Sequence, residues 1–275
     1  MADNIGIIPQ ALQPRDTIAF ISPSSRLNRL FPGRVYRGKA ALENLGYKVK
    51  IFFNDFEPKT HHEMVLLRCA EIHNAFLDTE VKAIICTIGG ISSNELLRYL
   101  DYDLIKANPK IFCGYSDITL LHHAIFTQTG LHTFYGPAVI PTFGEFPKPL
   151  SFSLDHFQKV LQTAEKPVGP LPRSIEWTEE FRDWMDGTDS IRPRHLMPTT
   201  GWEWLRPGKA TGRISGGCLP SLCQTLGSKF RPGYHGRILF LENPEGEVFH
   251  KPLPLEHTTS LMGDLANAGV FDVSP

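Results

Sequence analysis

The sequence predicts an α/β protein whose N-terminal half contains a parallel sheet. Three observations indicate this. Short apolar runs recur along the chain, amphipathic segments of helical spacing separate them, and most of the runs end in Gly, Ser or Pro. Of the 275 residues, 41% are hydrophobic and 21% are charged, a balance typical of globular proteins, and the length favours two domains.

Four apolar runs in the first half are predicted as buried strands, over residues 17–22, 47–52, 81–88 and 110–113. Apolar residues at helical spacing predict the intervening helices, over residues 35–45, 63–77, 119–128 and a segment that begins at 96–104. Strands that alternate with helices in this way form βαβ units, and a parallel sheet covered on both faces is therefore expected.

The pattern dissolves after the fourth βα unit. Nine prolines punctuate residues 141–207, and we predict a Pro/Trp-rich linker over 146–207 that exposes a partner- or substrate-facing segment. Residues 1–145 are then an N-terminal domain of flavodoxin or glutamine-amidotransferase type. Residues 208–275 are a smaller, apparently truncated α+β domain, with a strand over 237–241 and helices over 219–226 and 261–268.

Composition limits the class of protein. The formal charge of −1 argues against a chain that coats nucleic acid or an anionic membrane. The N-terminus lacks a secretory signal and no apolar run reaches membrane-spanning length, so a cytoplasmic protein is expected. The five cysteines form an odd, scattered set that suits free thiols. Neither a metal site nor an organic cofactor is predicted, because no zinc spacing and no nucleotide-binding fingerprint is present.

Ser116 directly follows the fourth predicted strand and precedes a helix. Ligands of such sheets bind at the carboxyl ends of the strands. A sharp strand-to-helix turn exposes a hydroxyl beside free backbone N–H groups, as in a nucleophile elbow, although the G-x-S-x-G spacing is absent. The alternative is that Ser116 only caps its helix, and capping serines are far more common than nucleophiles.

Two further strand ends carry candidate residues. Gly90 ends the third strand, and its backbone N–H together with that of Asp117 could form an oxyanion hole; the alternative is an ordinary glycine turn. Glu242 ends an apolar strand of the second domain, where it either orients a catalytic histidine or is a surface acid.

Taken together, these segments resemble the serine LD-carboxypeptidase family, which includes the microcin-C immunity peptidases. The resemblance is carried by motifs in order along most of the chain. They are Asp16-Thr17-Ile18-Ala19, Pro23-Ser24-Ser25, Arg68 with Asp78, Gly89-Gly90, Asn108-Pro109-Lys110, Gly114-Tyr115-Ser116-Asp117, Tyr135-Gly136-Pro137, Gly216-Gly217-Cys218-Leu219 and Leu241-Glu242-Asn243.

The resemblance implies a two-domain hydrolase with a Ser–Glu–His triad. Ser116 is then the nucleophile, Glu242 orients the histidine, and the amides of Gly90 and Asp117 form the oxyanion hole. Members cleave an amide bond next to a free carboxylate, in a murein-type peptide or an aminoacyl-nucleotide conjugate, without a metal or cofactor. A homodimer is possible. Tryptophans of the insertion favour the immunity branch, where an aromatic ring could stack on a base: Trp177, Trp184, Trp202 and Trp204.

The triad histidine is the departure from the family pattern. It is expected well after Glu242, beyond Pro275, so activity is expected to be impaired in this chain. Helix geometry places His122 and His123 roughly 9–10 Å along the axis from Ser116. His250 or His257 could serve only if the tail folds back, and His235 is expected at the far end of its strand. Two other functions stay open: a catalytically silent small-molecule or peptide-binding protein, and a flavodoxin-like nucleotide-binding domain.

Overall fold

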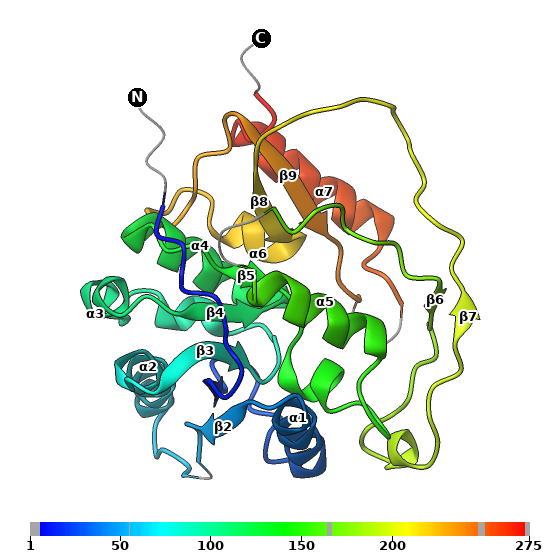
Figure 1. Ribbon diagram of the computed structural model, residues 1–275. Coiled ribbons are helices and arrows are strands. Elements are labelled where there is room, and N and C mark those ends of the chain that lie inside the picture. The colour runs from blue at the N-terminus through cyan, green and yellow to red at the C-terminus, as the bar shows by residue number, and fades with distance from the viewer. Residues whose placement is uncertain (1–5, 55, 164–166, 247–250, 273–275) are drawn as a thin grey trace.

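The computed structural model describes residues 6–54, 56–163, 167–246 and 251–272. Its centre is a five-stranded parallel sheet in the order β2-β1-β3-β4-β5 (Figure 1). The strands are β1 (Thr17–Ile21), β2 (Lys48–Ile51), β3 (Val81–Cys86), β4 (Ile111–Gly114) and β5 (Phe134–Tyr135). The predicted fold class, an α/β protein with an N-terminal parallel sheet, is confirmed.

Helices cover both faces of this sheet, because the central strands β1, β3 and β4 carry buried apolar side chains on both sides. Ala19 and Ile21 of β1 pack with helices α2 (His61–Leu77), α3 (Tyr102–Ala107) and α4 (Thr119–Thr129) on one face. Ile18 and Phe20 pack with α1 (Pro32–Asn44) and α5 (Ser151–Leu161) on the other face. The strand order reverses between β1 and β3, so the loops that follow these two strands flank the position where such sheets bind ligands.

Helix boundaries follow local capping. A capping box between Thr60 and Glu63 begins α2 at His61, two residues before the predicted start. The helix expected to begin at 96–104 is instead a 3-10 helix, Ser93–Leu96, and the separate helix α3. The side chain of Asp101 accepts a hydrogen bond from the N–H of Leu104 at 2.9 Å, and this cap starts a new helix.

The linker prediction for residues 146–207 is wrong over α5. Phe157 and Leu161 of this helix are 5% and 3% exposed and belong to the core under α1. The apolar residues of α5 recur at helical spacing, but the surrounding prolines obscured that signal. Between α5 and residue 213, the described residues form the two-residue strands β6 (Glu176–Trp177) and β7 (Met197–Pro198), which pair antiparallel, and a 3-10 helix, Thr188–Ser190.

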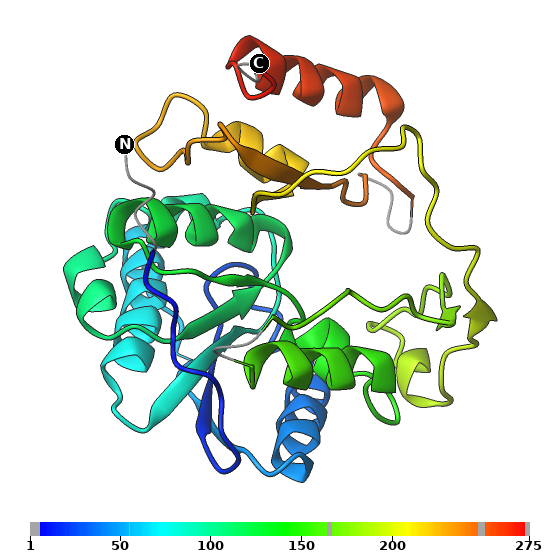
Figure 2. The same ribbon diagram turned by 45° about the horizontal axis from the view of Figure 1, so that its top comes forward.

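The C-terminal unit consists of β8 (Arg213–Cys218), α6 (Leu219–Gln224), β9 (Arg237–Glu242) and α7 (Leu255–Asn267). Its two strands are parallel, and the helices share a small apolar core with them. Figure 2 shows this unit stacked over α4. The N–H of Cys218 donates to Oγ1 of Thr119 at 3.0 Å, and Nε2 of His123 contacts the carbonyl of Gly216 at 3.0 Å.

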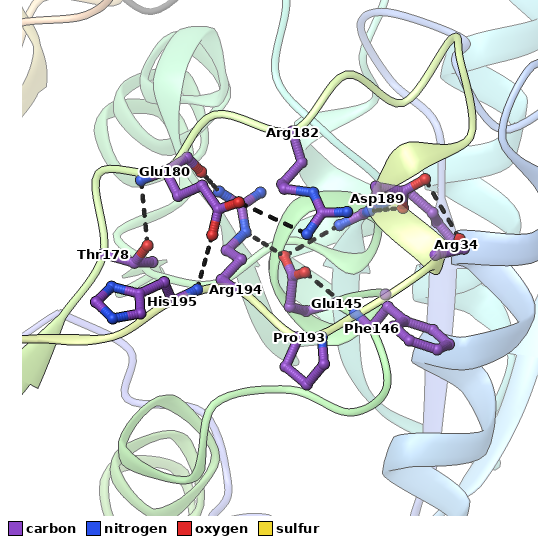
Figure 3. A network of polar contacts seen from close by, with 12 residues as sticks. Arg34, Glu145, Phe146, Thr178, Glu180, Arg182, Asp189, Pro193, Arg194 and His195 are labelled. Carbon is purple, nitrogen blue, oxygen red and sulfur yellow. Dashed lines mark hydrogen bonds and ion pairs between the residues drawn. The ribbon is translucent and has the colours of Figure 1, made fainter.

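Buried ion pairs attach the extended segment 178–195 to the N-terminal sheet domain (Figure 3). Arg34 of α1 pairs with Asp189 and with Glu145, and its guanidinium lies 4.4 Å from the ring centroid of Trp184. Arg194 also pairs with Glu145, at 3.0 Å. The segment is therefore fixed although it has little regular structure. No helix within the described ranges is long and apolar enough to cross a membrane.

Candidate active site

Ser116 lies at the carboxyl end of β4 in a conformation that L-residues rarely adopt, with φ +62°. It is the first residue of a 3-10 helix, Ser116–Ile118, which runs directly into α4. Its side chain caps neither helix, so the capping alternative does not describe this structure. The side chain is half-buried, which leaves the hydroxyl accessible on a strained strand-to-helix turn.

Gly89 packs directly against the Ser116 side chain. A Cβ atom at residue 89 would lie 2.6 Å from Cβ and 3.0 Å from Oγ of Ser116, and 3.1 Å from the carbonyl oxygen of Tyr115. Only glycine fits here without displacing the serine. The loop after β3 therefore approaches the candidate nucleophile with its backbone.

Asp117 connects the loops that follow β1, β3 and β4. Its Oδ2 accepts hydrogen bonds from Oγ of Ser24 at 2.5 Å and from the N–H of Ser93 at 3.1 Å. Its carbonyl accepts a third, from Oγ of Ser93 at 2.6 Å. Gly90 lies against the first of these loops, because a Cβ there would be 2.9 Å from the backbone N of Ser25. Burial raises the pKa of the Asp117 carboxyl.

Tyr135, the last residue of β5, joins the serine turn to Glu242 of the C-terminal unit. The N–H of Ser116 donates to the Tyr135 hydroxyl at 2.9 Å, and that hydroxyl donates to Oε2 of Glu242. The Tyr135 ring also contacts Phe240 of β9 edge-on, with centroids 5.4 Å apart. Burial and the hydrogen bond to Glu242 both raise the pKa of Tyr135, so the phenol remains a neutral donor.

Ser116 and Glu242, one from each unit, are thus linked through the Tyr135 hydroxyl. Sequence reasoning assigns Tyr135 no role beyond its place in a family motif. A usable signal was present, since a tyrosine at the end of a strand next to β4 must lie at the same sheet edge as Ser116.

The histidines near Ser116 in the sequence are engaged elsewhere. Nε2 of His122 donates to the carbonyl of Gly114 at 3.0 Å, and Nε2 of His123 donates to that of Gly216. Burial lowers the pKa of each to about 4, so both rings are neutral. His257 is exposed on α7, and His235 lies at the end of β9 opposite Glu242. His250 lies outside the described residues.

Nothing in the described part of the chain resembles a metal centre, since no three His, Cys, Asp or Glu side chains are grouped suitably. The chemistry this site offers is that of a hydroxyl on a strained turn, backbone amides at the ends of three strands, and a carboxylate opposite. Such a set can attack a carbonyl once a base removes the hydroxyl proton.

Sequence comparison identifies both units. Residues 18–136 match the LD-carboxypeptidase N-terminal domain, and residues 211–274 match the LD-carboxypeptidase C-terminal domain. The Microcin C7 self-immunity protein MccF of Escherichia coli is 35% identical over 85% of this chain and 68% of its own. A Bacillus subtilis protein provisionally named a murein peptide carboxypeptidase is 34% identical, over 88% of this chain and 66% of its own.

Comparison of structures agrees. MccF in complex with aspartyl sulfamoyl adenosine superposes with a TM-score of 0.83 at 33% identity, covering 98% of this chain and 78% of that one. Both domain matches, the identities to relatives and the superposition point to the same family, whose named relatives are peptidases of the carboxypeptidase and MccF kind. The chain belongs to the LD-carboxypeptidase family.

Proposed function

We propose that this protein is a serine hydrolase of the LD-carboxypeptidase type, with Ser116 as its nucleophile. One observation carries the proposal. Ser116 sits at φ +62° on the turn after β4, and a two-bond hydrogen-bonded path through Tyr135 links it to the carboxylate of Glu242. A strained, accessible serine opposite an acid from a second unit is the arrangement that amide hydrolysis by a triad requires.

In this mechanism, Ser116 Oγ attacks the carbonyl carbon of the scissile amide while its proton passes to a histidine. Glu242 holds the imidazole in the tautomer that accepts this proton. The negative charge on the carbonyl oxygen is stabilised by the N–H groups of Gly90 and Asp117. The histidine then protonates the leaving nitrogen, the C–N bond breaks, and water hydrolyses the acyl-serine by the same steps.

The proton acceptor is the part of this mechanism that the described residues do not supply. His122 and His123 donate to backbone carbonyls, and Glu242 accepts its hydrogen bond from Tyr135. We propose that a site limited to the described residues turns over slowly. In well-studied serine hydrolases, loss of one triad member lowers turnover by about 10⁴–10⁶-fold.

The proposed substrates share an amide or acyl-nitrogen bond next to a free carboxylate. One class is the murein-type peptide, which the name of the Bacillus subtilis relative supports. The other is an aminoacyl-nucleotide conjugate, which the ligand in the MccF complex supports. Trp184 adds no support for the second class, because its ring packs edge-on against Phe31 with centroids 5.4 Å apart and lies beneath Arg34.

The proposal extends to organisation and location. Residues 1–145 would form the nucleophile domain and 208–275 the domain that carries Glu242, with α5 assigned to the first. All five cysteines are free thiols, four of them buried, which supports a reducing compartment such as the cytoplasm. Small peptides or aminoacyl nucleotides are the proposed partners, and association as a homodimer is a further proposal.

Hydrolysis assays test this function directly. The wild-type chain and Ser116→Ala are incubated at high concentration with an L,D-tetrapeptide and with an aminoacyl sulfamoyl adenosine, with and without added imidazole. We expect slow release of product by the wild type only, accelerated by imidazole acting as the proton acceptor. Equal rates for the wild type and Ser116→Ala would remove Ser116 as the nucleophile.

A catalytically silent binding protein is the second candidate, and one observation favours it. The carboxylate of Glu242 is bonded by the Tyr135 hydroxyl, on the side that faces Ser116. A site in this state could bind an aminoacyl nucleotide without cleaving it. Thermal stabilisation of both the wild type and Ser116→Ala by the same ligand, without hydrolysis even in imidazole, would favour this function.

A further inference from the structure

Helix α2 carries two buried charged side chains on one face, Arg68 and Glu71. They lie three residues apart, and each residue is only 3% or 2% exposed. Burial of a charge is costly unless the group is paired or fully hydrogen-bonded. Neither residue takes part in the chemistry described above. Their structural role therefore follows from the loop residues that they contact.

Arg68 holds two loops together. Its Nη1 donates to the carbonyl of Pro23 at 3.2 Å, in the loop after β1. The same nitrogen lies 2.9 Å from Oγ and 3.3 Å from the carbonyl of Ser92, in the loop after β3. Its Nη2 pairs with Glu95. A planar guanidinium with several fixed donors can bridge such acceptors, whereas an ammonium group cannot hold the same geometry.

Glu71 holds the residue next to Pro23. Its Oε2 accepts the N–H of Ser22 at 3.2 Å, and its Oε1 pairs with Arg26 at 2.7 Å. Helix α2 therefore binds two consecutive residues of the β1 loop, Ser22 through its N–H and Pro23 through its carbonyl. Hydrogen bonds donated by a guanidinium are about twice as strong as neutral ones, so the contact that Arg68 makes is strong.

The two loops that Arg68 joins are those that surround the serine turn. The β1 loop provides Ser24, which donates to Asp117, and the β3 loop provides Ser93, which bonds Asp117 twice. The β3 loop also contains Gly90. A shift of either loop would therefore move the candidate oxyanion-hole amides relative to Ser116.

We propose that Arg68 is a positioning residue for the active site: by joining the loops after β1 and β3, it sets the distance between the Gly90 and Asp117 amides and Ser116 Oγ. This inference rests on the proposed hydrolase function. Arg68 touches no reacting atom. Its effect is therefore expected on the rate at which Ser116 Oγ reacts and not on the affinity for the reagent.

The test measures phosphonylation of Ser116 by a fluorophosphonate, in which Ser116 Oγ bonds to phosphorus and fluoride leaves, resolved into a reagent affinity and a first-order rate. We expect Arg68→Met to lower the first-order rate by about 10- to 100-fold with little change in affinity. Arg68→Lys should recover part of the lost rate. Arg68→Ala should also react slowly, and added methylguanidinium should restore its rate. The matched control is Arg98→Met, since Arg98 is exposed on the neighbouring segment. A first-order rate for Arg68→Met equal to that of Arg98→Met would overturn the proposal.

Hydrogen exchange separates failure of this inference from failure of the proposed function. If the fluorophosphonate does not label the wild type at Ser116, the hydrolase proposal fails. Amide exchange still reports on the two loops. Arg68→Lys should then exchange faster than the wild type in both residues 22–25 and 88–95, with α7 unchanged. Unchanged exchange in both loops would show that Arg68 does not hold them, whatever the protein catalyses.

Discussion

The hydroxyl of Tyr135 donates a hydrogen bond to the carboxylate of Glu242, and so joins the end of the N-terminal sheet to the end of β9. The two residues are 107 positions apart in the sequence. Because the same hydroxyl accepts the N–H of Ser116 at 2.9 Å, one side chain fixes both the serine turn and the opposing acid.

The contributions of Tyr135 and Glu242 to the free energy of unfolding should be coupled. In a double-mutant cycle of Tyr135→Phe and Glu242→Gln, we expect an interaction free energy of about 1–2 kcal/mol in urea unfolding, because each variant removes one partner of the same partly buried hydrogen bond. The control is Tyr102→Phe, which removes a 2.6 Å hydrogen bond to the carbonyl of Leu97 in a different part of the N-terminal domain. Tyr102→Phe should show no coupling to Glu242→Gln. An additive cycle for Tyr135 and Glu242 would contradict this prediction.

Gly89→Ala should displace the candidate nucleophile. The new methyl group would lie 2.6 Å from Cβ of Ser116, and we expect a loss of about 1–3 kcal/mol in unfolding free energy together with slower acylation of Ser116. Gly33→Ala is the matched control, since a Cβ there meets only Nη1 of Arg37 at 3.8 Å. This control lies within α1 and should gain about 0.5–1 kcal/mol. Equal stability and acylation in the two variants would show that Gly89 is not constrained.

The buried ion pair of Arg34 and Asp189 should be needed to hold the segment 178–195. Asp189→Asn leaves a 3% exposed guanidinium with one carboxylate partner fewer, and we expect a loss of about 3 kcal/mol and faster proteolysis within the segment. Glu43→Gln, which breaks the exposed pair with Lys39, should cost under about 0.5 kcal/mol. Proteolysis of Asp189→Asn at the wild-type rate would mean that other contacts suffice.

Glu71 should make stability depend on pH. Burial raises the pKa of its carboxyl to about 7 from an ordinary value of 4.5, and this outweighs the ion pair with Arg26. Between these values the folded protein keeps a proton that the unfolded chain releases. Its contribution to the unfolding free energy therefore falls as pH rises from 4.5 to 7, by at most about 1.4 kcal/mol per pH unit, and is constant above.

The measurement for Glu71 is the difference in unfolding free energy between the wild type and Glu71→Gln from pH 5 to 8. The difference removes a second pH effect that both variants share. His122 and His123, with pKa values lowered to about 4, decrease the unfolding free energy of the protein as pH falls below 6.5. The advantage of the wild type over Glu71→Gln should shrink up to pH 7 and then level off. Glu57→Gln, at an exposed position, should give a flat difference. A flat difference for Glu71→Gln would contradict the prediction.

The N-terminal sheet was predictable because its signals are local. Four of the five strands coincide with the predicted runs, whereas the two-residue β5 was not predicted, and the loops that end β3 and β4 place Gly89, Gly90 and Ser116 at one sheet edge by topology alone. The α/β class followed from this pattern. The choice of Ser116 and Glu242 as candidate site residues followed from the family motifs.

The remaining features depend on contacts between distant residues. The bond between Arg34 and Asp189 spans 155 positions, and no periodicity in the segment 178–195 indicates it. The role of Tyr135 depends on where β9 docks, which no local pattern fixes. Helix α5 was missed for another reason: its apolar spacing is helical, but nearby prolines made the whole region resemble a linker.

Phosphonylation of Ser116 by a fluorophosphonate tests the central claim most directly. Intact-mass measurement and peptide mapping after fluorophosphonate treatment, with imidazole present, should find one adduct, on the peptide that contains Ser116. Ser116→Ala should remain unmodified, whereas Ser221→Ala should be modified like the wild type, since Ser221 is buried in α6. An adduct that persists in Ser116→Ala, or none on the folded wild type, would contradict the assignment of Ser116 as the nucleophile.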